Sequence, residues 1–279
     1  MKPRGERPFW KMRPWLRVAG ALKTRGTWAS VVKNYKNWPI YFLDLLGLLR
    51  FDQATFVLKK GARFVVRPNT LDRGILDEIW IRDAYLVDLA RIPENGVVVD
   101  IGANIGAFCV LAALRARAGR VLCYEPHPEN FRLLQRNIQL NHLHNVAAFP
   151  LGVAGMQGRY KLMGEGALAT IQATPPASGT GLQVECTTLQ GIFEQNAIAR
   201  VTFLKCDCEG AEFEIFLKTP RDYLCRIDRI SMEYHLRDGE SSLTELLGTL
   251  ESASFEVQVA GRGRLGMVYA RNRSEGSPE

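Results

Sequence analysis

The chain has 279 residues, of which 47% are hydrophobic and 23% are charged, the composition of an ordinary globular protein with a sizeable core. No apolar run approaches the ~20 residues that a bilayer-spanning helix needs, and no secretory signal is visible, so a cytoplasmic protein is expected. The net charge of +7 is uneven: residues 1–50 hold eleven Lys and Arg against two acids, whereas the remainder holds 25 basic and 27 acidic residues.

The basic segment 1–50 also carries four of the five tryptophans, Trp10, Trp15, Trp28 and Trp38. Basic residues with interleaved aromatic ones suit an anionic partner. The simplest interpretation is a solvated lead-in, irregular over 1–30, whose tryptophans pack on the main domain. Peripheral contact with a membrane surface is the main alternative, and nucleic acid is the less favoured one.

Residues 38–91 predict a small N-terminal unit. The apolar stretch 38–49 predicts a short helix, and residues 55–58 and 63–66 predict two strands joined by a turn. Apolar spacing over 72–89 predicts a further helix, and the Pro-Glu-Asn-Gly turn after Ile92 marks a domain boundary. We expect 51–91 to cap the ligand site of a main domain over 92–273.

Within 92–273 strands and helices alternate, which predicts an α/β fold: a Rossmann-like, doubly wound, mainly parallel seven-stranded sheet. The last two strands, separated by a Gly-Arg-Gly turn, predict one antiparallel hairpin at the edge. The tail 274–279 is polar and is expected to be disordered. Predicted strands cover 97–101, 120–124, 146–153, 184–188, 201–206, 227–234, 255–259 and 266–270; predicted helices cover 107–117, 128–140, 211–217 and 241–250, and the glycine-rich stretch 155–181 predicts hairpin strands.

The segment Asp100-Ile-Gly102-Ala-Asn104-Ile-Gly106 joins the first of these strands to a helix. Glycines allow positive φ and close approach of the backbone to a ligand, and open α/β sheets bind nucleotides at such a turn. An acid at the strand end disfavours a pyrophosphate and favours a ligand with an amino group or a sulfonium. We therefore predict S-adenosyl-L-methionine as the cofactor.

Glu125 follows the next strand, 25 positions after Asp100, about where such folds place an acid on ribose hydroxyls. NAD is the rival ligand, but its fingerprint spaces glycines two and then three apart. Here Gly102 and Gly106 are four apart, and Asn104 stands where a middle glycine would. The spacing thus favours an adenosine ligand that also carries an amino acid.

Two later strand ends carry candidate catalytic residues, Asp207 and His235. Asp207 ends the strand expected beside the first one, where it could contact the methionine amino group, orient a hydroxyl or act as a base. His235 has a reference pKa suited to a base near neutral pH. A divalent metal held by Asp207, Glu209, Glu233 or His235 is a minor alternative, so no metal is predicted; the six cysteines are expected to be reduced thiols.

These segments together resemble the FkbM-type branch of class I S-adenosylmethionine-dependent methyltransferases. The resemblance covers about 55–270 and rests on the glycine-turn segment, Tyr124-Glu125-Pro126, Asn137 to Asn141, the Asp207-to-Glu212 segment and Glu233-Tyr-His235. An upstream piece from Arg67 to Asp72, with Glu78 and Tyr85, is also similar. The resemblance implies that Asp100, Gly102, Asn104 and Gly106 line the methionine side of the cofactor, that Glu125 binds the ribose, and that Asp207 borders the reaction centre; Asp72 joins the cofactor-binding candidates.

The resemblance also implies the reaction class, O-methylation of a hydroxyl on a sugar, glycolipid or secondary metabolite. The partner is then a small-molecule or glycan acceptor. Methylation of an amine or carboxylate, and a non-catalytic cofactor-binding module, are the alternatives. No residue pattern specifies an oligomeric state.

Overall fold

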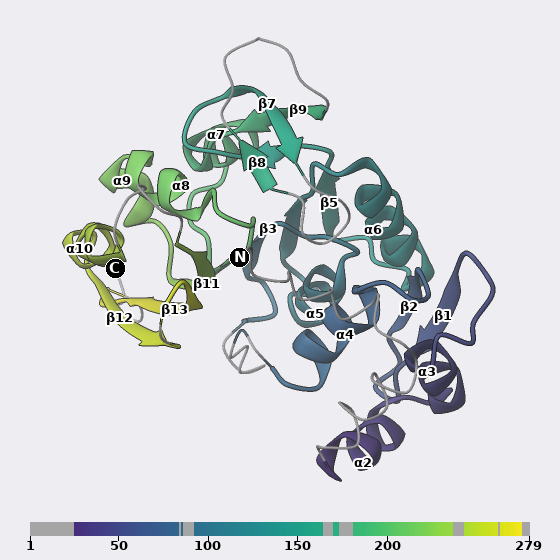
Figure 1. Ribbon diagram of the computed structural model, residues 1–279. Coiled ribbons are helices and arrows are strands. Elements are labelled where there is room, and N and C mark those ends of the chain that lie inside the picture. The colour runs from purple at the N-terminus through teal and green to yellow at the C-terminus, as the bar shows by residue number, and fades with distance from the viewer. Residues whose placement is uncertain are drawn as a thin grey trace, which may run out of the picture.

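The computed structural model describes residues 25–83, 85, 92–163, 170–172, 181–236, 243–261 and 263–274 (Figure 1). A seven-stranded sheet with the order β12-β13-β11-β10-β3-β4-β5 forms its centre. The five neighbouring strands from β11 to β5 are parallel, whereas β13 runs antiparallel to β11 and β12, which confirms the predicted doubly wound fold and its edge hairpin. The strands are β3 (Val97–Ile101), β4 (Arg120–Tyr124), β5 (Val146–Phe149), β10 (Phe203–Cys206), β11 (Arg229–His235), β12 (Phe255–Ala260) and β13 (Leu265–Asn272).

Helices cover both faces of this sheet because alternate strand residues point to opposite sides. Val98 and Val121 belong to the core under α4, α5 and α6, whereas their neighbours Val99 and Leu122 belong to the core under α7, α8 and α10. Strands β3 and β4 are therefore buried on both faces, which explains their continuous apolar runs. The helices are α4 (Asp72–Trp80), α5 (Ala107–Arg115), α6 (Pro128–Leu140), α7 (Leu189–Gln195), α8 (Glu212–Lys218), α9 (Arg221–Leu224) and α10 (Leu243–Ser252).

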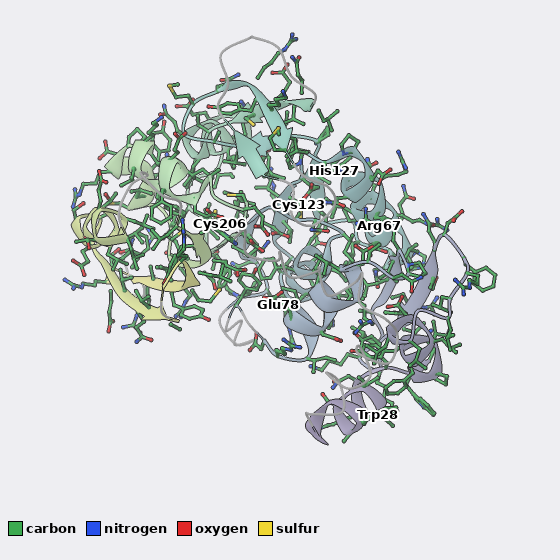
Figure 2. The ribbon with its side chains drawn as sticks, viewed as in Figure 1. Trp28, Arg67, Glu78, Cys123, His127 and Cys206 are labelled. Carbon is green, nitrogen blue, oxygen red and sulfur yellow. The ribbon has the colours of Figure 1, made fainter. Side chains whose placement is uncertain are left out.

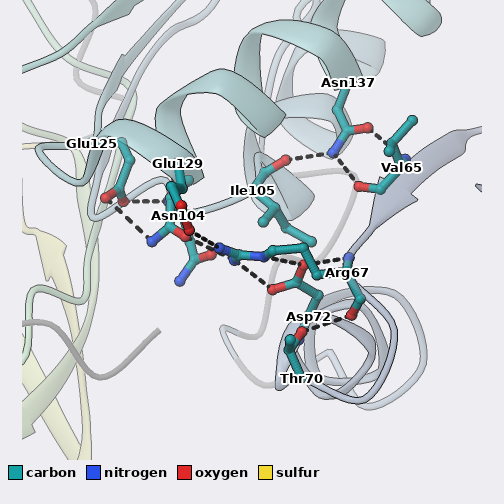
Figure 3. A network of polar contacts seen from close by, with 10 residues as sticks. Val65, Arg67, Thr70, Asp72, Asn104, Ile105, Glu125, Glu129 and Asn137 are labelled. Carbon is teal, nitrogen blue, oxygen red and sulfur yellow. Dashed lines mark hydrogen bonds and ion pairs between the residues drawn. The ribbon is translucent and has the colours of Figure 1, made fainter. Parts of the chain in front are cut away.

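An N-terminal unit of α2 (Arg25–Asn34), α3 (Trp38–Leu45) and the hairpin β1 (Ala54–Val57) to β2 (Arg63–Val66) packs at one edge of the molecule (Figure 1). Asn137 of α6 holds the hairpin in place. Its amide accepts from Val65 N at 2.7 Å and donates to Ile105 O at 2.8 Å, so one buried side chain joins β2 to the glycine turn (Figure 3).

Two predicted boundaries are wrong. Residues 25–30 were expected to be irregular, but they begin α2, while 1–24 lie outside the described residues. The helix expected over 72–89 ends at Trp80, and Asp83 soon takes a positive φ of 50°; residues 86–91 lie outside the described part. Of the tail, only Ser274 is described, and its backbone N–H donates to Asn272.

The strand expected over 146–153 is split in two. Pro150 cannot donate to a strand ladder, so β5 ends before it. The continuation, β6 (Gly152–Val153), pairs instead with β9 in a separate four-stranded sheet of order β6-β9-β7-β8. The other strands of that sheet are β7 (Gly158–Met163), β8 (Thr170–Gln172) and β9 (Leu182–Thr187).

Gly102 and Gly248 make a matched pair for testing how tightly the turn is packed. A Cβ on Gly102, whose φ is +74°, would lie 1.7 Å from the carbonyl oxygen of Asp207, whereas one on Gly248 in α10 meets nothing within 4 Å. We expect Gly102→Ala to lower the free energy of unfolding by roughly 2–5 kcal/mol through strain and overlap. Gly248→Ala should raise it by about 0.5–1 kcal/mol because alanine favours the helix.

Denaturant unfolding of the two variants and the wild-type protein measures both effects. A Gly102→Ala protein as stable as the wild type would contradict the close packing of the turn on Asp207.

Candidate functional site

The glycine turn sits where β3 ends, beside the end of β10. Asp100 of β3 pairs with Lys205 of β10, and Asp207 N donates to Ile101 O at 3.1 Å. Gly102 and Gly106 both take positive φ, as predicted, and Asn104 has a φ of 50°. The atoms that exclude a side chain at the glycines belong to the protein itself, Asp207 O and Leu134 Cδ1. The glycines thus let the turn pack against β10 and α6.

A cavity of about 540 Å³ opens beside this turn. Helix α4, the turn, the start of α5 and the ends of β10 and β11 contribute its walls, so it lies where the predicted site was placed. The lining residues used below are Glu78, Arg82, Tyr85, Gly102, Asn104, Lys205, Asp207, Glu209, Glu233 and His235.

Carboxylates dominate the charge of this cavity. Glu78 from α4, Asp207 and Glu209 after β10, and Glu233 from β11 all line it. Burial, together with the negative charge of Asp207, raises the pKa of Glu78 and raises that of Glu233 to about 7. Arg82, Lys205 and His235 line the cavity too, so the carboxylates leave a small excess of negative charge, which favours a ligand carrying positive charge.

Lys205 is a buried cation beneath the turn. Its Nζ lies 3.3 Å from Asp100 Oδ1 and 3.8 Å from Asp207 Oδ2, and it donates to Gly102 O at 2.8 Å. Burial lowers the pKa of Lys205, but the two carboxylates outweigh that effect and raise it above the ordinary value. Asp100 is fully buried and does not line the cavity. The structure therefore places this predicted cofactor residue behind the turn, facing Lys205.

Asp207 does line the cavity, and its side chain is 25% exposed. Tyr85 donates its hydroxyl to Asp207 Oδ2 at 2.7 Å, and the Lys205 ammonium lies 5.4 Å from the centre of the Tyr85 ring. Candidate ligand atoms of Asp207, Glu233 and His235 lie within 4.8 Å of one another. These atoms are close enough together to bind a divalent cation. Acidic clusters of this kind are also common in proteins that bind no metal ion there, so the spacing alone does not indicate a metal site.

His235 is held between two glutamates. Its Nδ1 lies 3.2 Å from Glu212 Oε1, and its Nε2 lies 3.4 Å from Glu209 Oε2. Burial lowers its pKa, but the hydrogen bond to Glu212 and the charges of Glu212, Glu209 and Asp207 raise it to about 9. His235 is therefore an imidazolium at neutral pH, and the reference pKa used to propose it as a base does not apply.

Glu125 braces the turn from behind (Figure 3). Its Oε2 accepts from Asn104 N at 2.8 Å and its Oε1 from His127 N at 2.9 Å, and burial raises its pKa to about 7. It is buried and does not line the cavity. In contrast, the Oδ1 of Asn104, a cavity residue, is buried without a hydrogen-bond partner.

Asp72 is likewise outside the cavity. Its carboxylate accepts from Arg67 Nη2 at 2.8 Å and Nε at 2.9 Å, and Arg67 also donates to Asn130 of α6 at 2.8 Å (Figure 3). This bidentate ion pair between Arg67 and Asp72 is one of the stronger kinds of side-chain contact. It anchors the start of α4, so Asp72 shapes the cavity wall and does not face the cavity.

Sequence reasoning assigned no role to four lining residues: Glu78, Arg82, Tyr85 and Lys205. Lys205 had a visible signal, since a lysine inside the apolar strand Phe-Leu-Lys-Cys must find buried partners. Glu78 and Tyr85 appeared only as matches to a family. Their approach to the cavity depends on where α4 ends, which the apolar spacing misplaced.

A doubly wound sheet with an acid-lined cavity at its central strand ends defines a Rossmann-like ligand-binding architecture. The sequence specifies it further: residues 100–257 match the model of the methyltransferase FkbM domain, which is more than half of the chain. The chain therefore belongs to the FkbM-domain methyltransferase family.

The chain is also similar to individual methyltransferases and to one solved structure. "Methyltransferase 1" of Beauveria bassiana is 27% identical over 65% of this chain and 80% of its own length. The hexuronic acid methyltransferase AglP of Haloferax volcanii is 24% identical over 78% and 89%, and the 31-O-demethyl-FK506 methyltransferase FkbM of Streptomyces tacrolimicus is 23% identical over 64% and 80%. A crystal structure of methyltransferase FkbM from Methylobacillus flagellatus aligns with a TM-score of 0.48 and 18% identity over 70% of this chain and 47% of that one.

The raised pKa of His235 predicts a pH-dependent stability. A basic group whose pKa is about 9 in the folded state and ~6.5 in the unfolded state stabilises the fold fully below pH ~6.5. That contribution is lost as pH rises through about 9. We therefore expect His235→Gln to have a lower unfolding free energy than the wild type, with the largest difference below pH ~6.5. The difference should disappear as the pH rises through about 9.

Denaturant unfolding across this pH range measures the difference, with His144→Gln, at an exposed position, as the control. A difference in unfolding free energy between His235→Gln and the wild type that does not change with pH would contradict the stabilising contacts of His235 with Glu209 and Glu212.

Proposed function

We propose that this protein is an S-adenosyl-L-methionine-dependent methyltransferase that methylates a hydroxyl of a sugar, glycolipid or secondary metabolite. The acid-lined cavity beside the glycine turn carries the proposal. S-adenosylmethionine bears a sulfonium and an ammonium, so its charge suits the excess of carboxylates. A volume of about 540 Å³ falls within the range of small-ligand sites.

The residues present fit this cofactor. Gly102 and Asn104 would hold it along the turn, and the unpartnered Asn104 Oδ1 is an acceptor that its ammonium or a ribose hydroxyl can satisfy. Glu78 of α4 also lines this cavity, which supports the expected capping role of the unit 51–91. When bound, the cofactor supplies a methyl group on a positively charged sulfur.

Methyl transfer to a hydroxyl needs a group that takes the hydroxyl proton. His235 is already protonated at neutral pH, and Asp207 already accepts the Tyr85 hydroxyl. Glu233 lines the same cavity and has a pKa of about 7, so it can accept a proton near neutrality. We assign Glu233 as the base, with Asp207 and His235 as its neighbours that orient the acceptor.

In this reaction the hydroxyl oxygen bonds to the methyl carbon, the carbon–sulfur bond breaks with its electrons on sulfur, and the proton passes to Glu233. Two relatives support the acceptor class, since their names specify a hexuronic acid and 31-O-demethyl-FK506.

Calorimetric titration with S-adenosylhomocysteine tests the cofactor assignment. We expect the wild type to bind, and Asn104→Gly to bind roughly tenfold or more weakly, because it loses an acceptor for a charged donor. Glycine retains the positive φ of this position. His144→Gln, at an exposed site on the loop after α6, is the control. A wild-type protein that binds no S-adenosylhomocysteine would overturn the proposal.

Transfer of a labelled methyl group to a panel of sugars, glycolipids and secondary metabolites tests the chemistry. The rate should rise with pH through about 7, the pKa of Glu233. Glu233→Gln should lower kcat by ~10²–10⁴ while leaving S-adenosylhomocysteine affinity nearly unchanged.

A rise centred near 9 that His235→Gln abolishes would make His235 the base instead. Label on an amine or carboxylate would establish the other nucleophile class. Binding of S-adenosylhomocysteine without transfer to any acceptor would leave a cofactor-binding module.

A further inference from the structure

The helices α2 and α3 and the loop after them expose an unusual number of large apolar side chains. Six of the eleven exposed large hydrophobic residues among those described lie within positions 28–51, and Phe51 alone is 73% exposed. Single exposed apolar residues are ordinary, but a contiguous group marks an interaction surface. We call this group the N-terminal patch: Trp28, Val32, Trp38, Leu43, Leu48 and Phe51.

Contacts join several members of the patch. The ring of Trp28 stacks on Phe42 with the centroids 4.0 Å apart, and Trp38 meets Phe42 edge-on at 5.9 Å. Val32 follows Trp28 by one helical turn, and Leu48 N donates to Leu43 O at 2.8 Å. Figure 2 shows Trp28 at the periphery of the molecule, away from the central sheet.

Positive charge surrounds the patch. Lys33, Lys36 and Arg50 are exposed, whereas Asp44 is buried and paired with Arg73 at 2.8 Å. Asp52 is the exposed acid of this stretch. The preceding segment 1–24 adds seven Lys and Arg against one glutamate. Aromatic and aliphatic side chains thus lie on elements that also expose three basic residues against one acid, and the sequence before them is basic.

We propose that the N-terminal patch docks on the surface of a membrane that contains anionic lipids. Tryptophan prefers the boundary between headgroups and acyl chains, and basic side chains are attracted to anionic headgroups. Among the described residues, no helix has the length and apolar character to cross a bilayer, so the contact lies in the interface plane.

Two other occupants fit less well. A nucleic acid would satisfy the basic residues and the tryptophans but would leave Val32, Leu43 and Leu48 without apolar partners. A second copy of this chain would cover the apolar side chains but would bring two strongly basic surfaces together, which is unfavourable.

The patch is joined firmly to the cavity wall. Tyr35, the residue after α2, and Tyr41 of α3 both donate their hydroxyls to Asp77 of α4, and all three residues are buried. The next residue, Glu78, lines the cavity. Docking would therefore hold the cavity at the membrane surface, whatever ligand the cavity takes.

Flotation of the full chain with vesicles tests the proposal. We expect the protein to float with vesicles of phosphatidylcholine mixed with phosphatidylglycerol, to bind phosphatidylcholine alone weakly, and to be released by high salt. Leu48→Ser/Phe51→Ser should weaken the binding about tenfold because it removes apolar insertion. Lys33→Glu/Lys36→Glu should weaken it by a similar factor and only on the anionic vesicles.

The matched control is Met156→Ser/Leu182→Ser, which removes two exposed apolar side chains near the four-stranded sheet. It should float like the wild type, and thermal unfolding checks that all variants fold. Equal flotation of the patch and control variants, or no flotation of the wild type, would overturn the proposal. So would a stable dimer that only the patch variant dissociates, or retention on nucleic acid without vesicle binding.

Discussion

The buried ammonium of Lys205 is the contact on which the site depends. Burying a lysine this deeply is costly unless the ammonium is paired. Here Asp100 and Asp207 flank it, and Gly102 O accepts a hydrogen bond from it. These contacts join β3, β10 and the glycine turn after β3 into one unit. The acid at the end of β3 thus serves to hold the lysine, and through the lysine it positions the cavity edge.

Two titratable groups that line the cavity, Glu233 and His235, have their pKa values shifted by their surroundings. Glu233 is partly buried and lies near the negative charges of Asp207 and Glu78. Both effects raise the pKa of Glu233 above its value in water. His235 gains Glu212 and Glu209 as partners, and it too holds its proton more tightly. The same excess of negative charge therefore leaves an acid able to accept a proton near neutrality beside a histidine that is already charged. Neighbouring groups whose pKa values are both shifted by their surroundings are typical of functional sites.

Sequence reasoning predicted the order of strands and the glycine turn because each rests on a local pattern: apolar runs, glycine spacing and turn residues. The roles of Asp100, Glu125 and His235 depend on tertiary partners, and no local pattern specifies these. Asp100 meets a lysine 105 positions away, and Glu125 receives the N–H of Asn104 across the turn. Their carboxylates look from the sequence like candidate ligand contacts, and in the fold both are buried and contact protein groups that hold the turn. The reference pKa of histidine failed for the same reason.

Helix α4 connects the N-terminal unit to the wall of the cavity. Its first residue, Asp72, binds Arg67, which also reaches α6 through Asn130. Near its end, Asp77 accepts the hydroxyls of the N-terminal unit while Glu78 faces the cavity. Adjacent helical residues point in directions about 100° apart, so one short helix can contact both units at once. A displacement of the N-terminal unit would have to move Asp77 or remove the two hydroxyl donors from its buried carboxylate, and that cost keeps the N-terminal patch and the cavity wall in register.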